Sequence, residues 1–224
     1  MPSPTRHRRT PDKLRTVLIT GFGPFPGAPF NPTQALVERL GARRRPALAD
    51  VSRVVHVFPT SYAAVDRELP DLLARHRPDV LLMFGLAART PFVRVETRAR
   101  NAISRLVPDA GGRFTKAGCI RPGAVAALPG RAPFQHLVSA ARAARVPTRV
   151  SRNAGAYLCN YVYWRASEVH SRKIPIVVFV HVPLIGRSSR PRGSRRRLSL
   201  ADLNRVGEAI LLALVAAARR AARR

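Results

Sequence analysis

Three residues that lie far apart along the chain could carry chemistry together, and the first is Cys159. It lies in residues 153–160 (NAGAYLCN), where Gly155 permits a sharp turn between a predicted strand and a predicted helix. In the first helical turns, the helix dipole and free N–H groups stabilise a thiolate and lower the thiol pKa from about 8.5. The same N–H groups could hold a developing oxyanion. On this segment alone, an ordinary buried cysteine is the slightly better interpretation.

The second residue is His181, near the end of the most strand-like segment, residues 174–182 (IPIVVFVHV). A polar ring in so apolar a strand needs a hydrogen-bonding partner. It is either a strand histidine bonded to backbone, or the base that takes the thiol proton and later protonates a leaving amine. Among the six histidines, His56 is the one serious rival because it also lies within a predicted strand.

The third residue is a carboxylate that would orient the imidazole. The chain has only 12 acidic residues, and Glu96, in residues 93–101 (VRVETRARN), follows the carboxyl end of a predicted strand. Arginines surround it in the sequence, so a local salt bridge is the plain alternative. Residue types and spacing leave the two interpretations about equal.

The elements that must position these residues alternate between strand-like and helix-like patterns. Five predicted strands are separated by amphipathic helices, and residues 90–128 predict loops with one or two extra strands. The strands are expected at 16–20, 51–58, 79–84, 148–152 and 174–182, and the helices at 31–40, 63–75, 134–144, 157–170 and 202–220. Asn31 and Ser199 are expected to cap two of the helices.

This alternation predicts an α/β protein with a mostly parallel sheet covered by helices on both faces. Sites in such sheets lie at the carboxyl ends of the strands. That rule selects residues 21–25, residues 85–96, the loop before Cys159, and His181. Residues 21–27 (GFGPFPG) have the wrong glycine spacing for a dinucleotide-binding loop, so nucleotide binding is discounted.

Length and composition fit one domain at residues 16–224, after a flexible basic tail at residues 1–15 and with a mobile basic loop at 186–197. The chain has 224 residues, of which 46% are hydrophobic. No apolar run reaches the ~18 residues of a membrane helix, and residues 16–20 are too short for a signal-peptide core, so a cytoplasmic protein is expected. Cys119 and Cys159 are too few for a zinc site, and a structural disulfide is not expected.

The net charge of +28 raises nucleic acid as a partner. The arginines are spread over the tail, a turn at residues 43–45, the loop at 186–197 and the C-terminal end, and only three of the 40 basic residues are lysines. No aromatic–basic interleaving or recognised binding motif accompanies them. Nonspecific polyanion binding is therefore expected more than a dedicated nucleic-acid role.

Five segments occur in an order that is specific as a set. They are GFGPF at 21–25 with NP at 31–32, PDV to GLA at 78–87, the spacing from Gly85 to Glu96 and Asn101, AGAYLCN at 154–160, and HVP at 181–183. Together they resemble the pyroglutamyl-peptidase I family, cysteine peptidases that remove an N-terminal 5-oxoproline from peptides. The resemblance runs from about residue 17 to residue 183, which is most of the chain.

The resemblance implies a three-layer α/β/α fold with no metal and no cofactor. It assigns Cys159 as the nucleophile, His181 as the general acid and base, and Glu96 as the residue that orients the imidazole. It also implies that Phe22 and Phe25 pack against the pyrrolidone ring, whose lactam N–H and C=O would be met by backbone groups and would give selectivity over proline. Homo-oligomers are common among members of the family.

Two positions depart from the family pattern. Members commonly have Gly-Arg after the turn at residues 85–87, where this chain has Ala88, Arg89 and Thr90. They often carry an arginine where this chain has Leu106. These departures keep open a divergent cysteine hydrolase of another small amide or lactam. A third hypothesis is a catalytically inactive basic protein that binds polyanions on the same scaffold.

Overall fold

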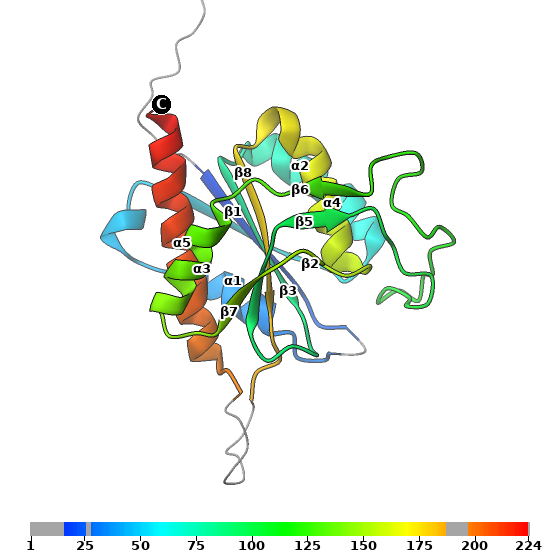
Figure 1. Cartoon of the computed structure of the whole chain (residues 1–224), viewed down its shortest axis with the longest axis horizontal. Coiled ribbons are helices and arrows are strands. Elements are labelled where there is room, and N and C mark those ends of the chain that lie inside the picture. The colour runs from blue at the N-terminus through cyan, green and yellow to red at the C-terminus, as the bar shows by residue number, and fades with distance from the viewer. Residues whose placement is uncertain (1–15, 26–27, 187–196, 224) are drawn as a thin grey trace, which may run out of the picture.

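The computed structural model describes residues 16–25, 28–186 and 197–223. Strands and helices alternate along these residues, as the hydrophobic pattern predicts (Figure 1). The strands are β1 (Thr16–Phe22), β2 (Ser52–Phe58), β3 (Val80–Leu86), β4 (Val93–Glu96), β5 (Arg98–Arg100), β6 (Ala127–Pro129), β7 (Thr148–Ser151) and β8 (Ile176–Val182). The helices are α1 (Pro32–Ala42), α2 (Tyr62–His76), α3 (Phe134–Ala143), α4 (Leu158–Lys173) and α5 (Leu200–Ala222), with a short 3-10 helix, η1 (Pro46–Leu48). The predicted tail at 1–15 and most of the predicted loop at 186–197 lie outside the described residues.

Two helix starts follow the capping residues predicted from the sequence. The side chain of Asn31 accepts a hydrogen bond from the N–H of Thr33, and Pro32 occupies the first helical position of α1. Ser199 caps α5 in a capping box, in which Ser199 and Asp202 each accept a hydrogen bond from the other's backbone N–H. Both predictions are confirmed.

Six strands form the main sheet in the order β2-β1-β3-β8-β4-β7, and β5 and β6 pair separately. The prediction of a mostly parallel sheet is confirmed, with one antiparallel pairing that sets β4 and β7 against the other four strands. Strand β4 runs antiparallel to β8 and parallel to β7. The region at 90–128, predicted as loops with one or two extra strands, supplies β4, β5 and the start of β6, and β4 enters the main sheet between β8 and the edge strand β7.

Side chains alternate between the two faces of each strand, and each face has its own helical layer. Helices α1, α3 and α5 cover one face, and α2 and α4 cover the other, so the fold has three layers (Figure 1). In β8, Val178, Val180 and Val182 pack under the first layer, while Val177 and Phe179 pack under α2 and α4. His181 alternates onto the face covered by α2 and α4. No helix in the described part of the chain is both long and apolar enough to cross a bilayer.

Candidate active site

The strand registers place one row of residues across the sheet near the carboxyl ends of β1, β3 and β8. Phe22 of β1 pairs with Phe58 of β2, and the parallel register of β1 with β3 brings Phe22 level with Gly85. Gly85 pairs with His181 of β8, and His181 pairs with Arg94 of β4. The row therefore brings together residues from five strands at one level of the sheet.

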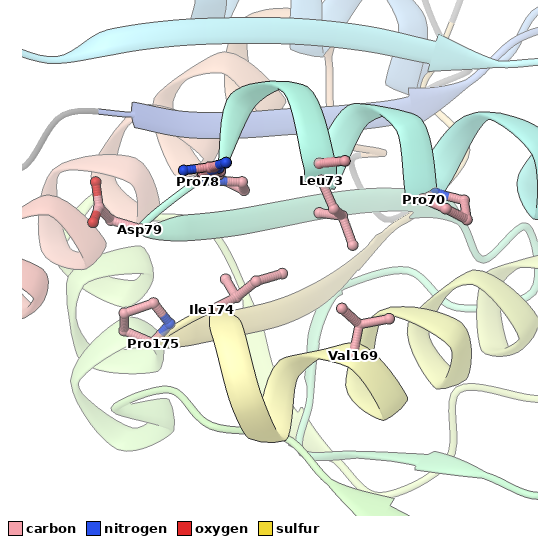
Figure 2. A pocket seen from close by; sticks show the side chains of 9 residues that line it. Pro70, Leu73, Pro78, Asp79, Val169, Ile174 and Pro175 are labelled. Carbon is pink, nitrogen blue, oxygen red and sulfur yellow. The ribbon is translucent and has the colours of Figure 1, made fainter.

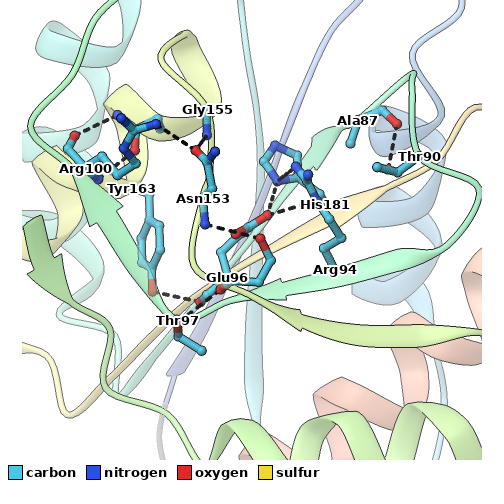
Figure 3. Close-up of polar contacts among 12 residues, drawn as sticks. Ala87, Thr90, Arg94, Glu96, Thr97, Arg100, Asn153, Gly155, Tyr163 and His181 are labelled. Carbon is cyan, nitrogen blue, oxygen red and sulfur yellow. Dashed lines mark hydrogen bonds and ion pairs between the residues drawn. The ribbon is translucent and has the colours of Figure 1, made fainter.

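Glu96 lies two residues after Arg94 in β4, and its side chain reaches the imidazole of His181. Its backbone lies opposite Phe179, and its side chain extends to His181, where Oε1 lies 2.8 Å from Nδ1 (Figure 3). Both side chains are buried, and the hydroxyl of Tyr163 donates to the backbone oxygen of Glu96 over 3.1 Å. Glu96 follows β3 in the chain, as predicted, and lies in β4, one of the extra strands expected within residues 90–128. Its antiparallel pairing with β8 brings its side chain to the histidine.

The environment keeps Glu96 ionised and His181 neutral. Burial by itself would raise the pKa of Glu96, but the hydrogen bond and charge of His181, the Ser151 hydroxyl and the charge of Arg94 together lower it. Burial lowers the pKa of His181; Glu96 opposes this shift and Arg94 adds to it. A carboxylate that accepts the Nδ1 proton fixes the neutral tautomer, which leaves Nε2 free to accept a proton.

Cys159 comes to this row from α4, as the second residue of the helix. Gly155 has a φ of 87°, and its N–H donates to the side chain of Asn153 over 3.0 Å, so the chain turns sharply just before α4. The side-chain amide of Asn160 is buried and hydrogen-bonds to Arg100 and Ala102, which fixes the first turn of α4 beside β5. The predicted turn and helix are confirmed, with the helix beginning one residue later than expected.

The sulfur of Cys159 packs directly over Gly85. A Cβ added to Gly85 would lie 2.6 Å from Sγ, so the missing side chain is what admits the sulfur. Because Gly85 pairs with His181 on the neighbouring strand, the thiol and the imidazole lie above adjacent strands on the same face. The structure thus brings Cys159, His181 and Glu96 to one place.

The prediction of a lowered thiol pKa is wrong for the free site. Cys159 is partly exposed, but the protein around its sulfur raises the pKa to about 12, and the negative charge of Glu96 adds to the rise. Arg94 and the backbone N–H groups of Cys159 and Leu86 act in the opposite direction without overcoming it. Desolvation therefore outweighs the helix N-terminus, and the thiol needs a base.

The two predicted substrate-contacting phenylalanines differ in their surroundings. Phe22 is buried, with 4% of its surface exposed, in the cluster that also contains Leu158 and Phe179 and against which Cys159 packs. Phe25 is half-buried, and its backbone pairs with Ala28 in an isolated antiparallel bridge. Phe22 thus shares an apolar cluster with Cys159, whereas Phe25 belongs to the loop that follows β1.

The rival histidine has another partner. His56 Nε2 lies 2.9 Å from Glu68 of α2, and β2 is separated from β8 by two strands.

The two departures from the family pattern, Arg89 and Leu106, are both exposed, Leu106 to 87%. Within the described residues, no group of three or more His, Cys, Asp or Glu side chains could hold a metal ion.

Sequence reasoning missed Arg94 and Tyr62. Arg94 Nη2 lies 3.1 Å from His181 Nδ1, and the alternation of β4 could have placed Arg94 on the same face as Glu96. Tyr62 of α2 is buried and packs edge-on against Tyr157, with ring centroids 6.0 Å apart. Burial raises the pKa of Tyr62, and the nearby thiolate form of Cys159 contributes to the rise, which puts α2 beside the site.

A separate apolar pocket lies at the other end of the sheet, where β3 and β8 begin (Figure 2). Its cavity of about 560 Å³ is lined by residues of α2, α4 and the two strand starts, among them Leu73, Ile174 and Pro175. Arg77 and Asp79 are its charged lining groups, and Asp79 accepts a hydrogen bond from the N–H of Thr16 over 3.1 Å. None of Cys159, His181 and Glu96 lines this pocket, so the candidate active site lies at the opposite end of the sheet, near His181.

Comparison with known proteins gives a consistent set of relatives. The profile of the family described as pyroglutamyl peptidase matches residues 15–220. The pyrrolidone-carboxylate peptidase of Levilactobacillus brevis is 30% identical over 203 residues, which are 90% of this chain and 98% of that protein. That of Clavibacter michiganensis is 34% identical over 171 residues, 76% of this chain and 79% of the relative.

Solved structures agree with the sequence relatives. The crystal structure of pyroglutamyl peptidase I from Bacillus amyloliquefaciens is 30% identical and superposes with a TM-score of 0.76 over 91% of this chain and 96% of that one. The pyrrolidone carboxyl peptidase from Thermococcus litoralis is 26% identical, with a TM-score of 0.78 over 89% of this chain and 93% of the other.

Proposed function

Because the chain belongs to the pyroglutamyl peptidase family, we propose that it is a cysteine exopeptidase that hydrolyses the amide bond after an N-terminal pyroglutamate. Cys159 is the nucleophile, His181 the general acid and base, and Glu96 the residue that orients the imidazole. One observation carries these roles. The buried contact of 2.8 Å between His181 and Glu96 lies on the face where the sulfur of Cys159 packs over Gly85.

The reaction starts from a neutral thiol and a neutral imidazole, since burial raises the pKa of Cys159 and lowers that of His181. Nε2 of His181 takes the thiol proton as the sulfur attacks the carbonyl carbon of the pyroglutamyl residue. The C–S bond forms and the carbonyl oxygen becomes an oxyanion. Glu96 stabilises the imidazolium while holding its Nδ1 proton, as the carboxylate does in other triads.

The first turn of α4 supplies donors for the oxyanion. The first N–H groups of a helix have no partner within it, and the N–H of Cys159 in α4, together with that of Leu86 at the end of β3, stabilises negative charge at the sulfur. When the tetrahedral intermediate collapses, the C–N bond breaks and Nε2–H protonates the departing amine. Water then gives a proton to Nε2 as its oxygen attacks the thioester carbonyl. The C–S bond breaks, pyroglutamate is released, and Nε2 returns the proton to the sulfur, which restores the thiol.

The substrate ring is small, flat and uncharged, and an aromatic surface near the nucleophile suits it. Phe22 and Phe25 at the end of β1 are proposed to contact it, and the burial of Phe22 in the cluster next to Cys159 supports its part in the wall. Peptides with an N-terminal pyroglutamate are the partners. A cytoplasmic location is proposed as well, and the two free cysteines agree with a reducing compartment.

The test is release of a fluorophore from a pyroglutamyl amide, with the matching prolyl amide as control and with and without a thiol alkylator. Turnover of the pyroglutamyl compound alone, abolished by the alkylator, is the expected result. Folded, reduced protein that turns over neither compound would refute the proposal. Equal turnover of both amides would refute recognition of the lactam.

A further inference from the structure

Arg94 is the second charged side chain that contacts the imidazole, and it approaches from the same strand as Glu96. Its backbone pairs with His181, and its side chain lies on the face that carries the site (Figure 3). Nη2 lies 3.1 Å from His181 Nδ1, and Nε lies 3.1 Å from Glu96 Oε1. Only 23% of the Arg94 side chain is exposed, so solvent screens this charge weakly.

Nδ1 cannot form a hydrogen bond with both neighbours at once. Arg94 is always a donor, so a hydrogen bond from it needs a lone pair on Nδ1, whereas a hydrogen bond to Glu96 needs a proton there. The carboxylate is the closer neighbour, at 2.8 Å, and it accepts in a charge-assisted bond. With Nδ1 protonated, Arg94 interacts with the oxygen of Glu96 and remains beside the ring as a fixed positive charge.

Among the described groups that face His181, Glu96 is the one charge that opposes Arg94. Glu96 comes from β4, Cys159 from α4, and β3 contributes only Gly85 at this level. The hydroxyl of Ser151 on β7 acts on the Glu96 carboxylate. Among the residues that the structure describes, Arg94 therefore pairs with one carboxylate, that of Glu96, which it shares with the imidazole.

Resting on the function proposed above, we propose that Arg94 is a positioning residue whose guanidinium, held between Glu96 and the Nδ1 side of His181, sets the pH range in which the Cys159–His181 pair works. A fixed positive charge favours the less protonated forms of the pair. It lowers the pKa of His181 and of Cys159 together, so both limbs of the pH–rate profile move to lower pH.

The variant Arg94→Gln removes the charge, and Arg94→Lys keeps it without the planar fork. Arg149→Gln is the matched control, because Arg149 pairs with Arg94 in the neighbouring strand but is exposed and lies 4.4 Å over the Phe92 ring. Each protein is assayed for kcat/KM on a pyroglutamyl amide as a function of pH. In a Cys119→Ser background, the alkylation rate of Cys159 is also followed as a function of pH.

In Arg94→Gln, both limbs of the profile and the alkylation midpoint are expected to rise by about one pH unit, the low end of shifts caused by an adjacent charge. The lysine variant and the Arg149 control are expected to stay near wild type. Melting temperatures identify variants that do not fold, in which case Arg94→Thr, a residue suited to a strand, replaces the glutamine.

Three results would overturn the assignment. The first is a folded Arg94→Gln or Arg94→Thr variant whose pH–rate limbs and alkylation midpoint equal those of the wild type. The second is an Arg94→Lys variant whose limbs shift as far as those of Arg94→Gln. The third is an Arg149→Gln control whose limbs shift by the same amount. The alkylation midpoint needs no substrate. A wild-type enzyme that fails to turn over the pyroglutamyl amide would refute the proposed function, while the midpoints would still decide the role of Arg94.

Discussion

The substitution Gly85→Ala tests the site where its geometry is tightest. Gly85 lies beneath the sulfur of Cys159 and beside the ring of Phe179, and its Cα pairs with His181. A methyl group there would lie 2.6 Å from Sγ and 2.6 Å from Cζ of Phe179, whereas ordinary van der Waals contacts begin near 3.4 Å. One added carbon therefore collides with the sulfur of Cys159 and with the ring of Phe179, which packs edge-on against His181.

The size of the effect follows from how far these atoms must move. Each contact falls short by about 0.8 Å, and a misplacement of ~1 Å in an active site costs roughly 10²-fold in rate. The cysteine can relieve the clash by rotating its side chain, which moves the sulfur out of line with the imidazole. Overpacking against Phe179 is expected to cost about 1–3 kcal/mol of stability, so the variant should remain folded.

The assay compares kcat/KM on a pyroglutamyl amide, alkylation of Cys159 and the melting temperature in wild type, Gly85→Ala and Gly118→Ala. Gly118 is the control because an added Cβ there meets nothing within 4 Å. We expect roughly 10²-fold lower kcat/KM and slower alkylation in Gly85→Ala alone. Full activity in Gly85→Ala would show that the sulfur does not work from the position over Gly85, and the arrangement argued here would be wrong.

Four other predictions test the proposed catalytic group and its surroundings. Cys159→Ser should lose nearly all peptidase activity while Cys119→Ser keeps it, and equal losses in both variants would exclude a single nucleophile. Glu96→Gln should lower kcat by about 10⁴-fold through loss of imidazole orientation. Phe22→Ala should destabilise the fold by about 3–5 kcal/mol in urea unfolding and weaken turnover, yet leave Cys159 open to alkylation. Since burial lowers the pKa of His181 below 6.5, the unfolded chain binds a proton that the folded protein does not. The free energy of unfolding should therefore fall as pH drops from about 6.5 through the lowered value, and less so in His181→Asn, as measured by urea midpoints.

The sequence by itself determined the elements of the fold and pointed to the residues that are proposed to react. Strand and helix periods are local properties, so the five predicted strands and the helices appear close to their predicted bounds, and Asn31 and Ser199 mark two helix starts. The motifs around Cys159 and His181, in their order along the chain, point to the family that the profile match shows. These features depend on neighbours in the sequence, which is why they can be read without the fold.

Only the tertiary structure decided how those residues meet. Strand β4 is short and lies within an irregular stretch, so nothing local reveals that it enters the sheet antiparallel between β8 and β7. That pairing gives His181 its carboxylate and Arg94, while His56 pairs with Glu68 instead. The pKa of Cys159 also depends on the fold. The helix terminus is visible in the sequence, but the surrounding protein that desolvates the sulfur comes from segments distant along the chain, and its effect is the larger.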